Sequence, residues 1–249
     1  MHARNQRVLN HAHIIHALTQ YVLERSNDDD RGGNTTSEQH ADSLTHRPRW
    51  YASAMIYTIG HSNHPIEHFV SLLRQHGIQA LADVRSNPYS RFNPQFNREK
   101  LQASLAAADG VRYVFLGEEL GARSKDPSCY DDAGRVSYAK LAQTPLFRQG
   151  IERLQTGIRH LRISILCAER NPLECHRTIL VARELEKVAI PVTHILHDGT
   201  LESNQQAMQR LAAELKLSAS DLFRSQDELI QDAYEMQGRR MGYVPPTSG

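Results

Sequence analysis

From residue 55 onward the chain alternates short apolar runs with segments of helical periodicity, and this alternation restricts the folds open to it. The runs are rich in β-branched residues, which indicates strands, and they cover residues 56–59, 79–84, 111–116, 162–168 and 191–196. Helices are predicted over residues 66–75, 97–108, 137–141, 147–159, 175–188, 204–215 and 219–237. Strands that are connected through helices favour a parallel sheet. We therefore expect an α/β fold, a single three-layer domain with a mostly parallel sheet and helices on both faces.

The N-terminal part of the chain has a different composition. Residues 26–49 are polar and contain few large apolar side chains, so they bury too little surface to offset the entropy lost on ordering. We expect residues 1–54 to form a disordered or weakly helical leader and residues 55–249 to form the α/β domain. A start codon assigned too early, with Met55 as the true first residue, explains the same pattern.

Charge and cysteine content exclude several protein classes. The chain has 29 basic and 28 acidic residues, so it is not built as a whole to wrap nucleic acid, although a local basic patch is compatible with this balance. No apolar run approaches the ~20 residues that cross a bilayer, and no secretory signal is present. The three cysteines, Cys129, Cys167 and Cys175, do not suit a disulfide scaffold. These features predict a cytoplasmic protein without a membrane partner.

Polar residues follow the first apolar run, where parallel sheets bind their ligands. Gly60 permits a sharp exit from the strand, and His61 and Ser62 come directly after it. One interpretation is a site in which His61 assists catalysis while Gly60 and Ser62 bind substrate. The other is a plain turn, with Ser62 capping the next helix.

The second apolar run ends in a charged pair. Asp83 and Arg85 are two residues apart, so strand alternation places them on the same side. A buried charge needs a partner or a ligand, which leaves a structural ion pair or a site where Asp83 carries protons and Arg85 holds phosphate. The loop that follows contains Tyr89 and Arg91, and its mixture of polar, basic and aromatic groups can bind phosphate or stack a base.

The richest segment spans residues 167–177. Cys167 and Glu169 end the most apolar run, and Cys175, His176 and Arg177 are predicted to open the next helix. The start of a helix favours anions and lowers the pKa of a cysteine located there.

Three chemical interpretations of this segment stay open. In the first, Arg177 and the helix start hold a phosphate while Glu169 or His176 acts as acid or base. In the second, Cys167 or Cys175 is a nucleophile for sulfur transfer or redox chemistry. In the third, the two cysteines and His176 bind zinc, but their spacing does not match the usual zinc motifs, so no metal and no other cofactor is predicted. A purely structural alternative makes Cys167 a small buried hydrophobe.

With these motifs in hand, the chain resembles a bacterial and archaeal family catalogued as domain of unknown function 488. The resemblance rests on the motifs at residues 57–62, 83–88, 116–121, 167–177, 194–199 and 232–237. It covers about residues 55–243, and it departs from the family pattern at Ala122, where a second glycine is expected. The resemblance implies the same fold, points to the same polar residues and suggests an association with nucleic-acid maintenance or repair. The resemblance does not indicate which reaction, if any, the protein catalyses.

These observations favour an enzyme acting on a nucleotide, nucleobase or nucleic-acid substrate that bears phosphate. The alternatives are a sulfur-transfer or redox enzyme and a non-catalytic module that binds nucleic acid or another ligand through residues 86–98. The catalytic candidates are Asp83, Glu169, His61, His176, Cys167 and Cys175. The substrate-binding candidates are Gly60, Ser62, Arg85, Arg177, Tyr89 and Arg91.

Overall fold

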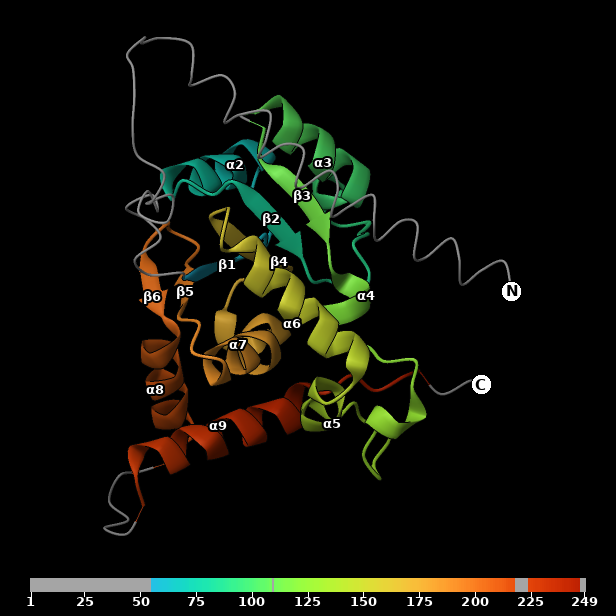
Figure 1. Cartoon of the computed structure of the whole chain (residues 1–249), viewed down its shortest axis with the longest axis vertical. Helices are drawn as coiled ribbons and strands as arrows, with labels where there is room; N and C mark the ends of the chain where they lie inside the picture. Colours follow the sequence, from blue (N-terminus) through green and yellow to red (C-terminus); the bar gives the residue numbers. More distant parts are fainter. Residues whose placement is uncertain (1–54, 109, 218–223, 247–249) are drawn as a thin grey trace, which may run out of the picture. The chain divides into compact units, whose positions relative to one another are not determined.

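The computed structural model describes residues 55–108, 110–217 and 224–246 (Figure 1). The predicted leader at residues 1–54 and the first residues of the predicted 219–237 helix lie outside this part of the chain. Among the helices described, none combines the length and the apolar character that spanning a bilayer requires.

The described residues form one six-stranded sheet with the strand order β3-β2-β4-β1-β5-β6. Its strands are β1 (Ile56–Gly60), β2 (Ala80–Asp83), β3 (Arg112–Phe115), β4 (Ile163–Cys167), β5 (Val192–Ile195) and β6 (Leu201–Ser203). The first five strands are parallel and confirm the five predicted runs, whereas β6 pairs antiparallel with β5 at the sheet edge. Strand β6 was not among the predicted runs, because it is three residues long and none of its residues is buried, so it shows no apolar run.

The same residues contain eight α-helices. They are α2 (Ile66–Gln75), α3 (Arg98–Ala107), α4 (Gly117–Leu120), α5 (Tyr138–Ala142), α6 (Pro145–Gly157), α7 (Arg183–Lys187), α8 (Asn204–Glu214) and α9 (Gln226–Met241). Short 3₁₀ turns occupy Pro94–Phe96, Pro127–Cys129 and Pro172–Glu174, and a π-helical segment, Arg177–Ala182, leads into α7. Helix α6 begins two residues before the predicted start because the Thr144 hydroxyl caps it and Pro145 fits its first turn.

Two apolar clusters, one on each face of the sheet, produce the predicted three layers (Figure 1). Helices α2 and α3 cover one face, where Phe69 and Leu101 pack with Leu166 of β4. Helices α6, α7, α8 and α9 contribute to the cluster on the other face, which Ile165 of β4 joins. Strand β4 is therefore buried on both faces, which explains its continuous apolar sequence.

The segment after β4 differs from the prediction. Helical backbone begins at His176, one residue after the predicted start at Cys175, and continues as the π-helical segment Arg177–Ala182. Asn171 caps the turn Pro172–Glu174, and that turn ends at Cys175, whose extended backbone (φ −138°, ψ 137°) lies outside the helical path. Cys175 thus belongs to the connection, whereas His176 opens the helical segment.

Candidate functional site

The neighbouring strands β1 and β4 direct their following segments to opposite faces of the sheet. Helix α2 after β1 packs on one face, and the π-helical segment and α7 after β4 pack on the other. Such a divergence opens a crevice at the carboxyl ends of the two strands. The pairing continues beyond the strands, because the His61 and Ser62 amides donate to the carbonyls of Cys167 and Ala168, each at 2.9 Å.

A cavity of about 320 Å³ lies in this crevice. It is lined by His61, Ser62, Asn63, Arg85, Asn87, Tyr89, Ser90, Asn93, Ala168 and Arg170. Amides, hydroxyls and two guanidinium groups are present, and no carboxylate is among the lining residues. A lining of this kind suits an anionic ligand. Ser62 adopts a left-handed backbone conformation (φ 48°) at the cavity wall, an unusual conformation for a residue other than glycine.

Asp83 positions Arg85 and does not itself line the cavity. The Asp83 carboxylate accepts hydrogen bonds from the Arg85 amide, Nε and Nη2 at 3.0, 2.9 and 2.6 Å, and from the Tyr113 hydroxyl at 2.7 Å. Arg85 also donates from Nη2 to the carbonyl of Phe96 at 2.9 Å. Both charged side chains are buried, so the structural ion pair foreseen from the sequence is present, and it holds one guanidinium edge toward the cavity.

His61 is a neutral imidazole at neutral pH. Its Nε2 lies 3.2 Å from Arg85 Nη1, which can only donate, so Nε2 accepts and Nδ1 donates to the Ser62 carbonyl at 2.8 Å. Its ring stacks on Phe96 with 4.3 Å between the ring centroids. Burial, with a further contribution from the charge of Arg85, lowers the pKa of His61 to about 4. Both nitrogens are engaged, so His61 supports Arg85 and forms part of the cavity wall.

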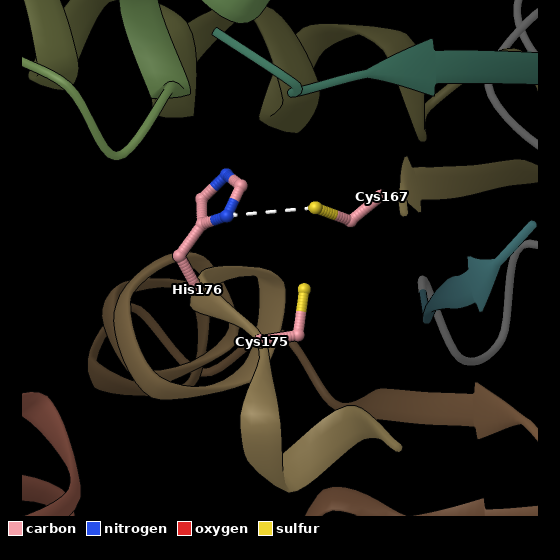
Figure 2. Close-up of side chains that lie close together, drawn as sticks. All are labelled: Cys167, Cys175 and His176. Carbon is pink, nitrogen blue, oxygen red and sulfur yellow. Dashed lines mark hydrogen bonds between the residues drawn. The ribbon is translucent and has the colours of Figure 1, made fainter. Parts of the chain in front are cut away.

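A second group of reactive side chains lies next to the cavity, inside the protein. The ligand atoms of Cys167, Cys175 and His176 all lie within 4.8 Å of one another, and Figure 2 shows the three side chains converging from the end of β4 and from the following connection. His176 Nε2 lies 3.0 Å from the carbonyl of Val84, and Nδ1 lies 3.5 Å from Cys167 Sγ. All three residues are buried.

The two thiols have different proton affinities. Burial raises the pKa of Cys167 well above its usual value. Burial acts in the same direction on Cys175, but a hydrogen bond from Cys167 and the charge of Arg177 outweigh it and hold the pKa of Cys175 well below its usual value. Glu169 Oε2 is 2.9 Å from Cys175 Sγ, and partial desolvation of this carboxylate together with the neighbouring Cys175 raises the pKa of Glu169.

Arg177 and Gly60 fix the backbone around this group. Arg177 is 1 % exposed and donates from Nη1 to the Glu169 carbonyl at 2.7 Å and from Nη2 to the Arg170 carbonyl at 3.3 Å. A Cβ atom on Gly60 would lie 1.8 Å from the Glu169 carbonyl oxygen, so only glycine allows the two segments to approach this closely. Both residues were predicted to bind substrate, but neither lines the cavity, and their contacts assign them a positioning role.

The loop after β2 places one of its two predicted binding residues at the cavity. Tyr89 lines it and donates its hydroxyl to Glu99 at 2.7 Å. Arg91 lies outside the lining, with its guanidinium 4.8 Å from the centroid of the Phe92 ring. The sequence analysis did not single out Asn87, Ser90, Asn93 or Arg170, although the Asn- and Ser-rich composition of this loop was a usable signal.

A second cavity of about 300 Å³ adjoins the first at Arg170. It is lined by Arg170, Asn171, Pro172, Leu196, His197, Asp198 and Arg210. Arg170 therefore faces two concave surfaces.

With the geometry in place, comparison with known families is informative. Residues 65–183 match the model of a family described as domain of unknown function DUF488. Over these residues the chain is similar to the DUF488 domain. The match covers the loop after β2 and the segment from Cys167 to Arg177, which confirms the resemblance drawn from the sequence motifs. It begins after β1, so His61 and Ser62 lie outside the matched DUF488 region. Comparisons with curated proteins and with solved structures gave no significant match.

Proposed function

We propose that this chain is an enzyme acting on a nucleotide, nucleobase or nucleic-acid substrate that bears phosphate, bound in the cavity between β1 and β4. The observation that carries the proposal is the composition of the lining, which offers hydrogen-bond donors and two arginines without a carboxylate. Phosphate oxygens only accept hydrogen bonds, and a site free of carboxylates does not repel their charge.

Arg170 supplies the net positive charge of this cavity. The charge of Arg85 is balanced by Asp83, whereas Arg170 is exposed and, among the described residues, has no carboxylate within ion-pair distance. The side chains of Asn87, Ser90 and Asn93 add neutral donors around it. This combination of one free cation with several neutral donors fits a single phosphate group better than a polyanion.

The loop at the cavity rim accounts for the nucleobase part of the proposal. Tyr89 is 50 % exposed and Phe92 is 78 % exposed, unusual values for large aromatic rings. Exposed aromatic rings beside a basic groove stack on bases in proteins that bind single strands. Tyr89 and Arg170 line the same cavity, so one nucleotide-class ligand could place its phosphate near Arg170 and stack its base on Tyr89.

Two further expectations belong to this proposal. The Glu169 carboxylate lies beside Cys175, and its two neighbours in the sequence, Ala168 and Arg170, line the cavity. This position supports Glu169 as the acid or base.

The three cysteines are unpaired, as in a reducing cytoplasm, and a part in nucleic-acid maintenance or repair is compatible with the substrate class.

Ligand binding and turnover with matched arginine variants test the proposal. The full-length protein is titrated with nucleoside mono-, di- and triphosphates, nucleobases and short single- and double-stranded oligonucleotides, and each binder is followed for product formation. Arg170→Ala is expected to weaken binding at least tenfold. Arg159→Ala, which removes an exposed arginine outside the cavity lining, is expected to leave it unchanged.

The outcomes separate the candidate functions. Binding without turnover of any ligand supports the non-catalytic module. Equal loss in both arginine variants, or no binding by the whole panel, contradicts the cavity as the substrate site. Sulfur-transfer or redox chemistry at Cys167 or Cys175 stays a prediction, and the burial of both thiols is the reason that the solvent-accessible cavity carries the main proposal.

A further inference from the structure

Cys167, Cys175 and His176 form a group with the geometry of a metal site. Cys167 ends β4, Cys175 follows the turn Pro172–Glu174 and His176 opens the next helical segment, and in Figure 2 the two sulfur atoms and Nδ1 surround a common space. We propose that these three side chains bind one zinc ion, with a fourth coordination position on the side of Glu169. This site is separate from the proposed phosphate-binding cavity and does not depend on it.

His176 is already oriented as a metal ligand. A backbone carbonyl only accepts hydrogen bonds, so Nε2, 3.0 Å from the Val84 carbonyl, carries the proton. In the neutral imidazole, Nδ1 then presents its lone pair toward Cys167 Sγ, 3.5 Å away. Zinc-binding histidines commonly donate their second nitrogen to a carbonyl or a carboxylate in this way, because the bond fixes the ring and its tautomer.

The distances fit tetrahedral coordination with little rearrangement. With metal–ligand bonds of about 2.0–2.3 Å, neighbouring ligand atoms of a tetrahedral zinc site lie roughly 3.3–3.8 Å apart. The 3.5 Å between Cys167 Sγ and His176 Nδ1 falls in this range. All separations in the group are within 4.8 Å, so the widest needs to shorten by about 1.5 Å at most.

The fourth position has a candidate neighbour in the structure. Glu169 Oε2 is 2.9 Å from Cys175 Sγ, so a water molecule bound on this side of the ion would lie near the carboxylate. Three protein ligands and one exchangeable position are the pattern of catalytic zinc sites. The Arg177 amide, 3.5 Å from Cys175 Sγ, adds a donor to the thiolate.

Metal content and cobalt spectroscopy test the proposal directly. The full chain is produced with zinc present, purified under reducing conditions without chelator, and analysed by mass spectrometry for bound metal. We expect about one zinc per chain. After zinc removal, Co²⁺ is expected to give thiolate charge-transfer absorption and the visible bands of tetrahedral cobalt. This readout needs no substrate and no variant.

Cysteine variants identify the ligands. Cys167→Ala, Cys175→Ala and His176→Ala are expected to weaken zinc binding at least about 10–100-fold, since loss of an outer-shell partner alone has an effect of that size. Cys129→Ala is the matched control, because Cys129 is equally buried but lies outside the group. Reduced, folded wild-type protein that holds no zinc and gives no cobalt–thiolate bands overturns the proposal. Equal loss of zinc in the Cys129 variant, or a Cys167–Cys175 disulfide in freshly purified protein, also counts against it.

Discussion

Asp83 and Arg85 form a buried, two-point ion pair at the end of β2, with Nε 2.9 Å from Oδ1 and Nη2 2.6 Å from Oδ2. The two residues are close in the sequence, but their pairing orients Arg85 toward a segment that is distant in the sequence. It leaves Nη1 of Arg85 directed at His61, which comes from the end of β1, and so connects the two sides of the cavity.

Removal of one member of this pair is expected to destabilise the fold strongly. Asp83→Ala leaves Arg85 buried without its counter-ion, for which we expect a loss of about 3–5 kcal/mol in the free energy of unfolding. Urea denaturation measures it. Glu235→Ala at the exposed pair with Arg239, where the charges are 4.0 Å apart, is the control and should cost at most about 0.5 kcal/mol. A similar small loss in both variants contradicts a structural role for the buried pair.

A methyl group at Gly60 is expected to separate the segments that follow β1 and β4. In Gly60→Ala the new Cβ meets the Glu169 carbonyl oxygen at 1.8 Å, a clash with backbone that no side-chain rotation relieves. We expect a loss of at least about 3 kcal/mol, at the upper end of overpacking effects. Gly238→Ala is the control, because its Cβ finds only ordinary contacts of 3.6 Å or more within α9. Thermal unfolding should show the control unchanged or slightly stabilised.

Acidification is expected to destabilise the protein through His61. Its pKa is lowered from 6.5 to about 4 by burial and by Arg85, so the unfolded chain binds a proton more readily than the folded one. Stability is therefore complete above pH 6.5 and is lost as the pH falls toward 4. Between pH 7 and pH 5 we expect this residue to account for about 2 kcal/mol. His61→Gln should show a shallower decrease over this range in denaturation experiments; an unchanged pH profile would falsify the assignment.

The exposed rings of the loop after β2 are expected to contribute to binding of single-stranded oligonucleotides. If Phe92 stacks on a base, Phe92→Ala should weaken binding by about 1–3 kcal/mol with little dependence on sequence. Leu146→Ala removes an exposed apolar side chain on α6 and serves as the control. Fluorescence anisotropy at fixed salt concentration compares the two. Equal oligonucleotide affinities of the two variants would mean that the bases do not stack on Phe92.

Much of the fold could be predicted from local patterns in the sequence. The five parallel strands and most of the helices were predicted because each has its own apolar run or periodicity, as β4 has in Ile163–Cys167. The errors came from segments where local pattern is weak. Strand β6 is too short and too exposed to show alternation, and the segment after the turn that ends at Cys175 is π-helical over Arg177–Ala182, where a regular α-helix was predicted.

The candidate site could be predicted from the sequence only in part. The motifs selected His61, Arg85 and Tyr89, which line the cavity, but they also selected Gly60 and Arg177, which hold the backbone around it. Residue type alone does not tell an arginine that lines a cavity from one that donates to backbone carbonyl groups. That distinction depends on burial, which arises when the whole sheet is assembled.

The sequence by itself determined that the chain builds a parallel sheet and which residues end its strands, because alternation and periodicity are properties of neighbouring residues. Only the tertiary structure decided that β4 lies beside β1, since strand order depends on pairing between distant segments. The same reason applies to the cysteine cluster. Its spacing along the chain argued against a metal, yet the turn after β4 and the Val84 carbonyl, 92 residues before His176, bring the three ligand atoms within 4.8 Å of one another.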